Sequence, residues 1–199
     1  MIKRFFDFTF ALLGLFVFSP LLLVIAVLIK LKMPGPILFK QKRVGQNGEL
    51  FTMVKFRTMT IGHGGSSISV KGESRITSLG AILRKYKLDE LPELWNVIKG
   101  EMSLVGPRPD VPGYADKLEG RNRDILKLKP GITGPASLKY ANEEELLSLQ
   151  PDPKRYNDEV IYPDKVRINL EYLDRQNLLV DLNLILHTIF GKKPKYNWI

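Results

Sequence analysis

The stretch FTFALLGLFVFSPLLLVIAVLI, residues Phe8 to Ile29, contains no charged side chain. As a straight helix with a rise of about 1.5 Å per residue it would be about 33 Å long. That length matches the apolar core of a bilayer, so the stretch predicts a membrane-embedded helix. A cleaved signal peptide is disfavoured, because its apolar region is about 7–15 residues long and ends at a small-residue cleavage site.

Two features of this segment favour a hairpin that enters the membrane and returns. Ser19-Pro20 lies close to its midpoint, where proline removes a helical hydrogen bond and the serine can satisfy freed backbone groups. Both flanks are basic, and basic flanks tend to stay in the cytoplasm. The basic residues are Lys3 and Arg4 before the stretch and Lys30, Lys32, Lys40, Lys42 and Arg43 after it. We therefore predict a re-entrant helix–break–helix over residues 1–34, with a kinked single span as the alternative.

The composition limits the class of partner. The chain has 199 residues and a formal charge of +9, which suits one domain that prefers anionic partners such as phosphates or an acidic membrane surface. It has no cysteine, so disulfides, thiolate catalysis and cysteine-based zinc sites are excluded. Its two histidines, His63 and His187, are far apart and are interpreted as structural.

Residues 35–199 are predicted to form one cytoplasmic domain of the α+β class, small and mostly helical. Alternating apolar and polar residues around GQNG, residues 45–48, predict a short β-hairpin. The Gly- and Ser-rich segment Ile61–Ser74 predicts a mobile loop, and no P-loop or dinucleotide fingerprint is present. Amphipathic helices, some of them expected at the membrane interface, are predicted over residues 78–88, 143–150, 163–176 and 178–191. The basic, aromatic tail KKPKYNWI, residues 192–199, suits either an interface or solvent.

The best-marked helix is DELPELWNVIKG, residues 89–100, whose apolar residues follow the i, i+3, i+4, i+7 pattern. Asp89 is a candidate N-cap, Pro92 suits the first turn, and Gly100 is a good C-terminal stop. Two adjacent carboxylates, Asp89 and Glu90, begin this helix. One interpretation is a cap with an acidic first turn, which stabilises by about 1 kcal/mol.

The other interpretation of Asp89 and Glu90 is chemical. A carboxylate at a helix N-terminus among cations is expected to stay ionised at neutral pH and can act as a nucleophile. An adjacent carboxylate can hold Mg²⁺, which usually binds through one or two carboxylates and substrate phosphates. Candidate phosphate ligands surround this pair in the sequence. They are Lys55, Arg57, Arg84 and the turn Pro107-Arg108-Pro109. A solvated basic face and a plain rigid turn are the alternatives.

Taken together, the blocks KFRTM, LRKYKLDELPELWNVIKGEMSLVGPRP and KPGITGPAS resemble the bacterial sugar transferases, also called monotopic phosphoglycosyl transferases. The resemblance covers roughly residues 3–181, and the short chain resembles the small members that start glycan assembly. Pro135 and Ser137 depart from the pattern of many members. The resemblance implies a re-entrant anchor at the cytoplasmic face of the bacterial inner membrane. Neither the sugar nor the oligomeric state is specified by these residues.

The resemblance also implies a mechanism. Asp89 would attack the sugar-bearing phosphate of a UDP-sugar and expel UMP, and undecaprenyl phosphate would then take the phosphosugar from the aspartyl adduct. Glu90 would help to hold Mg²⁺. Lys55 and Arg84 would contact phosphates, with Arg57 as a further candidate, and Pro107, Arg108 and Pro109 would help to hold the nucleotide.

Two rival functions were weighed against this mechanism. A non-catalytic membrane adaptor that binds acidic lipid or protein would account for the charge and the apolar stretch, but not for Asp89-Glu90. A nucleic-acid binder needs aromatic side chains interleaved on a basic surface, whereas the aromatics here gather in the membrane segment, so no nucleic-acid partner is expected.

Overall fold

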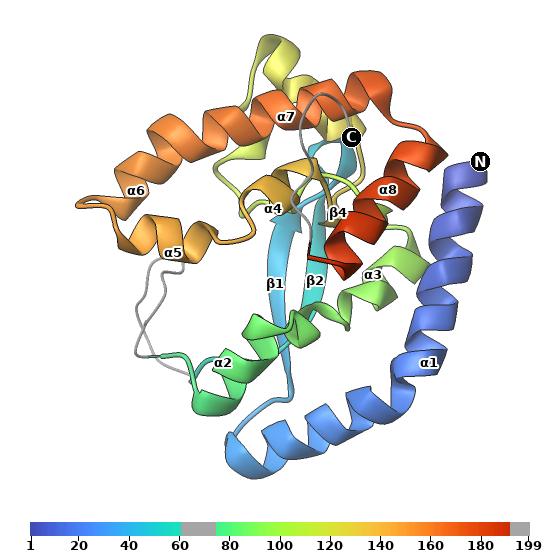
Figure 1. The fold of residues 1–199 in the computed structure, drawn as a ribbon, viewed down its shortest axis with the longest axis vertical. Helices are drawn as coiled ribbons and strands as arrows, with labels where there is room; N and C mark the ends of the chain where they lie inside the picture. The colour runs from blue at the N-terminus through green and yellow to red at the C-terminus, as the bar shows by residue number, and fades with distance from the viewer. Residues whose placement is uncertain (61–74, 192–199) are drawn as a thin grey trace.

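The computed structural model describes residues 1–60 and 75–191. The predictions for the Ile61–Ser74 loop and for the tail 192–199 therefore lie outside the described residues. Figure 1 shows one long helix, α1, running along one side of the molecule and beneath it, with a two-stranded ribbon in the centre and the C-terminal helices above. The fold is a mixture of helices and short strands, as predicted for the α+β class.

The N-terminal helix α1 (Ile2–Lys32) is continuous through Pro20. Figure 1 shows it changing direction about half-way along its length. The Ser19 hydroxyl donates to the Phe16 carbonyl oxygen at 2.7 Å. Phe16 lies four residues before Pro20, so its carbonyl is the one that receives no helical N–H from the proline. The predicted break is therefore a bend within one helix rather than a gap between two helices.

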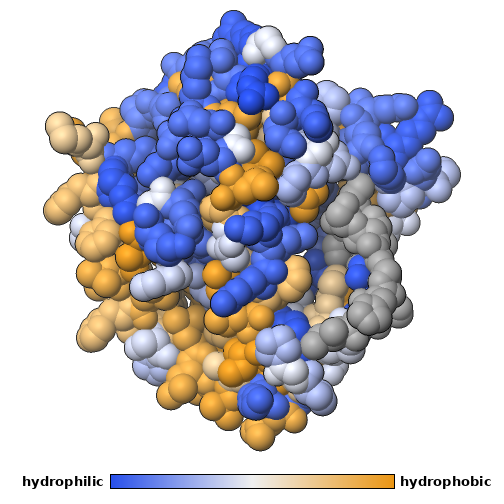
Figure 2. Space-filling model, turned by 180° about the vertical axis from the view of Figure 1, so that it is seen from behind, coloured by the Kyte–Doolittle hydropathy of each residue, from blue (hydrophilic) through white to orange (hydrophobic). Residues whose placement is uncertain are grey.

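Among the described residues, α1 is the one helix that is long and apolar enough to cross a bilayer. Only 11% of its most apolar window is buried, whereas the core helix of a soluble protein would be mostly buried. Its large side chains project outward, among them Phe5, Phe16, Leu23 and Leu31. Figure 2 shows this apolar surface along one side and the lower end of the molecule, with hydrophilic residues gathered opposite.

Both halves of α1 pack against the rest of the chain. In the first half, Ala11 and Leu15 join a cluster with Leu94 and Val97. In the second half, Ile25, Ile29 and the following Met33 join another cluster, whose other buried members are Phe56 and Leu83. The helix is therefore attached to one domain on both sides of its bend.

A polar cluster at the start of α1, formed by Lys3, Arg4 and Asp7, also binds the domain. Lys3 donates to the buried Asp181 carboxylate and to the Val105 carbonyl oxygen. Arg4 donates to the carbonyl oxygens of Val97 and Ile98. The buried Asp7 carboxylate accepts from the Ser103 hydroxyl at 2.8 Å and from the Leu104 backbone NH at 3.1 Å. The basic flank before the apolar stretch thus has specific protein partners.

The predicted hairpin is confirmed. Strand β1 (Leu38–Val44) pairs antiparallel with β2 (Leu50–Phe56) across the 3₁₀ turn η1 (Gln46–Gly48). Asn47 and Gly48 both have positive φ, at 58° and 85°, as the tight Asn-Gly turn requires. This pairing brings Lys55 to the end of β2, close to the segment that carries Asp89.

The segment that carries the adjacent carboxylates Asp89 and Glu90, here called the dyad, consists of three short elements. They are α2 (Ser78–Lys85), the 3₁₀ turn η2 (Leu88–Glu90) and α3 (Glu93–Lys99). Gly100 ends α3 with φ 85°, as predicted. Asn96 is fully buried and ties α3 to β2, because its amide accepts from Val54 NH and donates to the Thr52 carbonyl oxygen. Because Asn96 faces inward, the neighbouring Trp95 is exposed. The spacing of apolar residues therefore predicted the helix correctly but not which of its sides is buried.

A second sheet was not predicted. Strand β3 (Ser103–Val105) pairs in parallel with β4 (Gly131–Thr133), so the two glycine-proline segments GPRP and KPGITGP lie side by side. The Gly131 NH donates to the Pro107 carbonyl oxygen at 2.8 Å, and the Gly106 NH donates to the Thr133 carbonyl oxygen at 2.9 Å. The turn around Arg108 is therefore fixed from the opposite segment.

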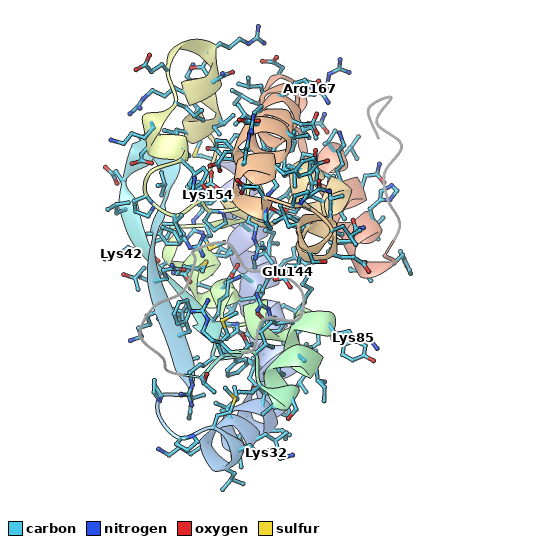
Figure 3. All side chains as sticks on the ribbon, turned by 90° about the vertical axis from the view of Figure 1, so that its left-hand side faces the viewer. Lys32, Lys42, Lys85, Glu144, Lys154 and Arg167 are labelled. Carbon is cyan, nitrogen blue, oxygen red and sulfur yellow. The ribbon has the colours of Figure 1, made fainter. Side chains whose placement is uncertain are left out.

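The remaining elements cover this sheet and the hairpin, and the three predicted C-terminal helices are confirmed. The 3₁₀ segments are η3 (Ala115–Lys117) and η4 (Gly120–Lys127). The helices are α4 (Pro135–Lys139), α5 (Glu143–Ser148), α6 (Pro153–Tyr156), the π-helical η5 (Asn157–Ile161), α7 (Tyr162–Arg175) and α8 (Leu178–Ile189). Lys32 at the end of α1 and Arg167 on α7 lie at opposite ends of the molecule, so the charged α7 is far from that end of the anchor (Figure 3).

Candidate active site

Asp89 lies inside the turn η2 and does not cap α3. The N-cap of α3 is Pro92, so the capping interpretation of Asp89 was wrong. The residue is 8% exposed, and its Oδ1 has no hydrogen-bond partner among the described residues. Lys87, two residues earlier, has φ 56°, a left-handed conformation that is costly for a residue with a Cβ. A buried, unpartnered carboxylate oxygen after a strained residue is typical of a functional site rather than of a helix cap.

The electrostatic setting of Asp89 differs from the one expected from its sequence neighbours. Burial and the adjacent Glu90 carboxylate raise the pKa of Asp89, and they outweigh Lys55, Arg84 and Lys87, which act to lower it. The cations therefore do not decide the direction of the shift, and the ionisation of Asp89 at neutral pH stays a prediction. A carboxylate with a raised pKa is a stronger base than an exposed one, which favours nucleophilic attack by its ionised form.

Glu90 is held by two cations through one oxygen. Its Oε1 accepts from Lys55 Nζ at 3.0 Å and from Arg108 Nη2 at 2.8 Å. Burial acts to raise the pKa of Glu90, but Arg108 and Lys55 outweigh it, so the pKa lies well below its usual range. Glu90 is therefore negative at neutral pH, and the structure brings it together with Lys55 and Arg108 as the sequence predicted.

Arg84 and Arg57 occupy different places. Arg84, on α2, donates to Glu144 Oε1 at 2.8 Å and lies near enough to Asp89 to lower its pKa. Figure 3 labels Glu144 near the middle of the view, between Lys42 of β1 at one edge and Lys85 of α2 at the other. Arg57 is buried and donates to the carbonyl oxygens of Met33 and Pro34, just after α1. The structure thus uses Arg57 to hold the end of the anchor and does not bring it to the Glu90 cluster.

The Pro107-Arg108-Pro109 turn forms one wall of a small pocket next to Glu90. The Pro109 carbonyl oxygen accepts from Arg43 Nη1 at 3.0 Å. The residues lining the pocket come from β1, β2, α3 and the turn, and are Arg43, Met53, Lys55, Glu93, Arg108 and Pro109. Three cations therefore face one space, as an anion-binding site requires. Asp89 does not line this pocket. Its neighbour Glu90 contacts Lys55 and Arg108, and both of these residues do line it.

Sequence reasoning missed three residues of this region: Arg43, Glu93 and Asp110. Arg43 had been interpreted as a membrane flank, although it stands at the end of a predicted strand. Glu93 lies four residues after Asp89, a spacing that places both on one side of a helical turn. Asp110 directly follows GPRP and accepts from the Tyr162 hydroxyl at 3.2 Å. The sequence position of each residue could have drawn attention to it, but it did not indicate which side chains the residue would contact in the fold.

Asp110 should make the stability of the protein depend on pH. Burial raises its pKa to about 6, against the opposing effects of Lys165, Tyr162 and Arg43. Because the folded pKa lies above the unfolded value, this stabilising contribution is present below about pH 4 and is lost as pH rises through 6.

We expect Asp110→Asn, which resembles the neutral acid, to stabilise the protein by about 1–2 kcal/mol at pH 7.5 and to have little effect near pH 4. Denaturant unfolding at both pH values measures this difference. An equal effect at the two pH values would contradict the assignment.

The acidic residues of the site can be compared with the ligands that Mg²⁺ prefers. Among residues 1–60 and 75–191, no group of three or more His, Cys, Asp or Glu side chains converges to hold a metal. Mg²⁺ does not need such a group, since it commonly takes one or two carboxylates and completes its shell with water and phosphates. The orphaned, buried Asp89 Oδ1 and the adjacent Glu90 carboxylate fit that mode of binding.

Comparison with known proteins identifies the family to which this arrangement belongs. The family model described as "Bacterial sugar transferase" matches residues 1–192. The chain belongs to the bacterial sugar transferase family. The resemblance seen in the sequence is thereby confirmed, and with it the expectation that the protein is an enzyme, so the adaptor alternative loses its support.

Three relatives illustrate the similarity of this sugar transferase to known proteins. The "Uncharacterized sugar transferase EpsL" of Bacillus subtilis is 34% identical over 95% of this chain and 86% of its own length. A "UDP-glucose:undecaprenyl-phosphate glucose-1-phosphate transferase" of Caulobacter vibrioides is 35% identical over 94% of this chain and 68% of its own. A "UDP-N-acetylgalactosamine-undecaprenyl-phosphate N-acetylgalactosaminephosphotransferase" of Aeromonas hydrophila is 34% identical over 94% of this chain, which spans 43% of that relative.

Proposed function

We propose that the protein transfers a phosphosugar from a UDP-sugar to undecaprenyl phosphate, through a covalent intermediate on Asp89. The observation that carries this proposal is the buried, unpartnered Asp89 Oδ1 beside Glu90, whose carboxylate is held by Lys55 and Arg108. Relatives named for this type of reaction with UDP-glucose and UDP-N-acetylgalactosamine support the class of both substrates. The site residues support neither sugar over the other.

In the first half-reaction, an Asp89 carboxylate oxygen attacks the phosphorus that bears the sugar. A new oxygen–phosphorus bond forms, the bond to the UMP phosphate oxygen breaks, and UMP leaves with the electron pair. Lys55 and Arg108 would meet the diphosphate oxygens, because both present charged donors next to Glu90. Arg43 and the Pro107–Pro109 turn would form the wall against which the nucleotide end rests.

In the second half-reaction, an oxygen of undecaprenyl phosphate attacks the same phosphorus. The bond to Asp89 breaks, the carboxylate is restored, and the product is a polyprenyl-diphosphate sugar. No net proton is required for the exchange of one phosphate oxygen for another. Because both half-reactions use one carboxylate, we expect ping-pong kinetics.

Bound Mg²⁺ would supply charge neutralisation to the diphosphate, as it commonly does for phosphoryl groups. Glu90 is the residue proposed to hold it, with the adjacent Asp89 carboxylate as a second ligand. Both recorded contacts of Glu90 use Oε1. The protein's own part is to hold this carboxylate negative and to keep Lys55 and Arg108 beside it.

The anchor is proposed to be re-entrant, with both ends on the cytoplasmic face of the plasma membrane. Support comes from the packing of α1, because Lys3 near its start and Met33 just after its end contact the same domain. A straight span would carry one end to the far side of the bilayer. The bend near the middle and the exposed apolar surface fit a helix that dips into one leaflet.

The polar cluster at the start of α1 gives a test of this anchor. We expect Asp7→Asn to lower the free energy of unfolding by about 1–3 kcal/mol, since the buried carboxylate has two donors. Denaturant unfolding in detergent measures the loss. If positive charge alone retained this end in the cytoplasm, removal of an acid from the flank would not weaken the attachment. Asp174→Asn, which breaks only an exposed pair with Arg121, is the control and should change stability by less than about 0.5 kcal/mol.

Topology is measured directly with single cysteines, because the chain has none. Ile2→Cys and Pro36→Cys place a thiol at an exposed position just before and just after the apolar stretch. Both should react with a membrane-impermeant reagent only from the cytoplasmic side of oriented vesicles. Labelling on opposite sides would show a single span.

The reaction itself is tested by UMP release. Purified protein with Mg²⁺ and undecaprenyl phosphate is incubated with a panel of UDP-sugars, including glucose, galactose, N-acetylglucosamine, N-acetylgalactosamine and bacillosamine derivatives. At least one donor should release UMP and yield a lipid-linked diphosphate sugar. Release of UDP in place of UMP would show transfer of the sugar without its phosphate and would contradict the proposal.

A further inference from the structure

The buried carboxylate of Glu93 has no part in the chemistry proposed above. Glu93 is the first residue of α3, and its side chain is 3% exposed. Its Oε1 lies 3.0 Å from Lys55 Nζ. A negative charge in the first turn of a helix is favourable, but that role is served equally well at the surface. Burial against a lysine of the site indicates a more specific role.

The Lys55 ammonium is shared between two carboxylates that differ in their other partners. It lies 3.0 Å from both Glu90 Oε1 and Glu93 Oε1. Glu90 also accepts from Arg108 at 2.8 Å, whereas the recorded ion pair of Glu93 is with Lys55. Donor phosphates that approach Lys55 and Arg108 must therefore compete with Glu90 for both cations. The Glu93 side chain is 3% exposed and that of Glu90 is 9% exposed, so Glu93 is the more buried of the two carboxylates beside Lys55.

We infer that Glu93 is a positioning residue that holds the Lys55 ammonium at the pocket wall while Glu90 yields its contacts to the donor's phosphates. This inference rests on the proposed function and assigns how its phosphate site is kept in place. Glu93 is the one carboxylate among the six pocket-lining residues, opposite three cations. Without it, a long lysine side chain 13% exposed would be free to follow Glu90 or to turn toward solvent.

Two simpler roles for Glu93 make different predictions. A plain counter-charge would weaken anion binding, so its removal would tighten binding to a nucleoside diphosphate. A purely structural residue would affect stability alone, independently of Lys55. A positioning residue acts through Lys55, so its effect on phosphate binding should vanish once Lys55 is removed.

The experiment is a double-mutant cycle on the dissociation constant for UDP, measured by titration calorimetry with the full chain in detergent. We expect Glu93→Ala to weaken UDP binding about tenfold and Glu93→Gln to stay within about threefold of the parent, because its amide keeps an oxygen of the same shape beside the Lys55 ammonium, 3.0 Å away in the parent. In the Lys55→Ala background, Glu93→Ala should add no more than about a twofold change. Asp181→Asn is the matched control, since it alters another buried carboxylate paired with a lysine, and should leave the constant unchanged.

Each other outcome overturns the inference. Tighter UDP binding by Glu93→Ala shows a counter-charge, and a loss that persists without Lys55 shows a structural role. If the parent protein does not bind UDP, the proposed phosphate site at Lys55 and Arg108 is wrong. UDP binding without UMP release from any UDP-sugar would defeat the proposed function, while the cycle would still decide the role of Glu93.

Discussion

Asp89→Asn should reduce UMP release by about a thousandfold or more, because the amide cannot form the proposed bond to phosphorus. Folding should be unaffected. The Asp89 Oδ1 has no described hydrogen-bond partner, so the substitution breaks no contact of that atom, and it removes a buried carboxylate whose pKa is raised by burial. The unfolding midpoint should therefore equal or exceed that of the parent.

Glu90→Gln is the informative comparison for Asp89→Asn. It keeps the shape of a side chain that accepts from Lys55 and Arg108 but removes its charge. We expect a smaller loss of activity, restored in part by higher Mg²⁺ concentration, because Glu90 is proposed to hold the metal rather than the phosphosugar. An Asp89→Asn protein that keeps more than a tenth of parental turnover would exclude Asp89 as the nucleophile.

Gly131→Ala should have the largest effect on stability, at about 3 kcal/mol or more, and the protein is expected to fold poorly. A Cβ at Gly131 would lie 2.1 Å from the Gly106 nitrogen and 2.5 Å from the Thr133 carbonyl oxygen. Both are backbone atoms of the β3–β4 pair, which cannot move without breaking it. Because this pair fixes the turn around Arg108, any folded fraction should also bind UDP more weakly.

Gly14→Ala provides the control for the glycine substitution. Its Cβ would lie 3.2 Å from the end of the Leu94 side chain, which can move, and alanine favours a helix. We expect a change within about 1 kcal/mol in thermal unfolding. If Gly131→Ala were as mild as Gly14→Ala, the close approach of GPRP and KPGITGP would be wrong.

The local pattern of the sequence was sufficient for the hairpin and for most helices, whereas the grouping of Asp89, Glu90, Lys55 and Arg108 depended on the family resemblance. Period and turn residues are local properties, and the resemblance placed the dyad. The parallel β3–β4 pair was not predictable in this way, since each strand has three residues and its partner lies about 28 positions away. Short strands carry too little alternation to be recognised, although the segment after β3 was noted as a rigid turn.

The errors concern polar residues that the fold buries. Arg57 was a candidate phosphate ligand because it stands near a predicted strand and guanidinium groups suit phosphate oxygens, but it holds the end of α1. One interpretation made Asp89 the cap of α3, yet the helix begins later, and burial rather than the nearby cations decides the direction of its pKa shift. Asp7 was overlooked because a single acid near an apolar stretch carries no pattern, and the spacing of Glu93 from Asp89 did not indicate Lys55 as its partner. Their partners depend on contacts across the fold that spacing does not show.

The central claim is that Asp89 captures a phosphosugar, and intact-protein mass spectrometry tests it most directly. Protein is incubated with the UDP-sugar that releases UMP, without undecaprenyl phosphate, and is quenched within one turnover. The account predicts an added mass of one phosphosugar on the parent, located on Asp89 by fragmentation, absent from Asp89→Asn, and discharged by undecaprenyl phosphate. An active parent that never carries this mass, or carries it on another residue, would contradict the account.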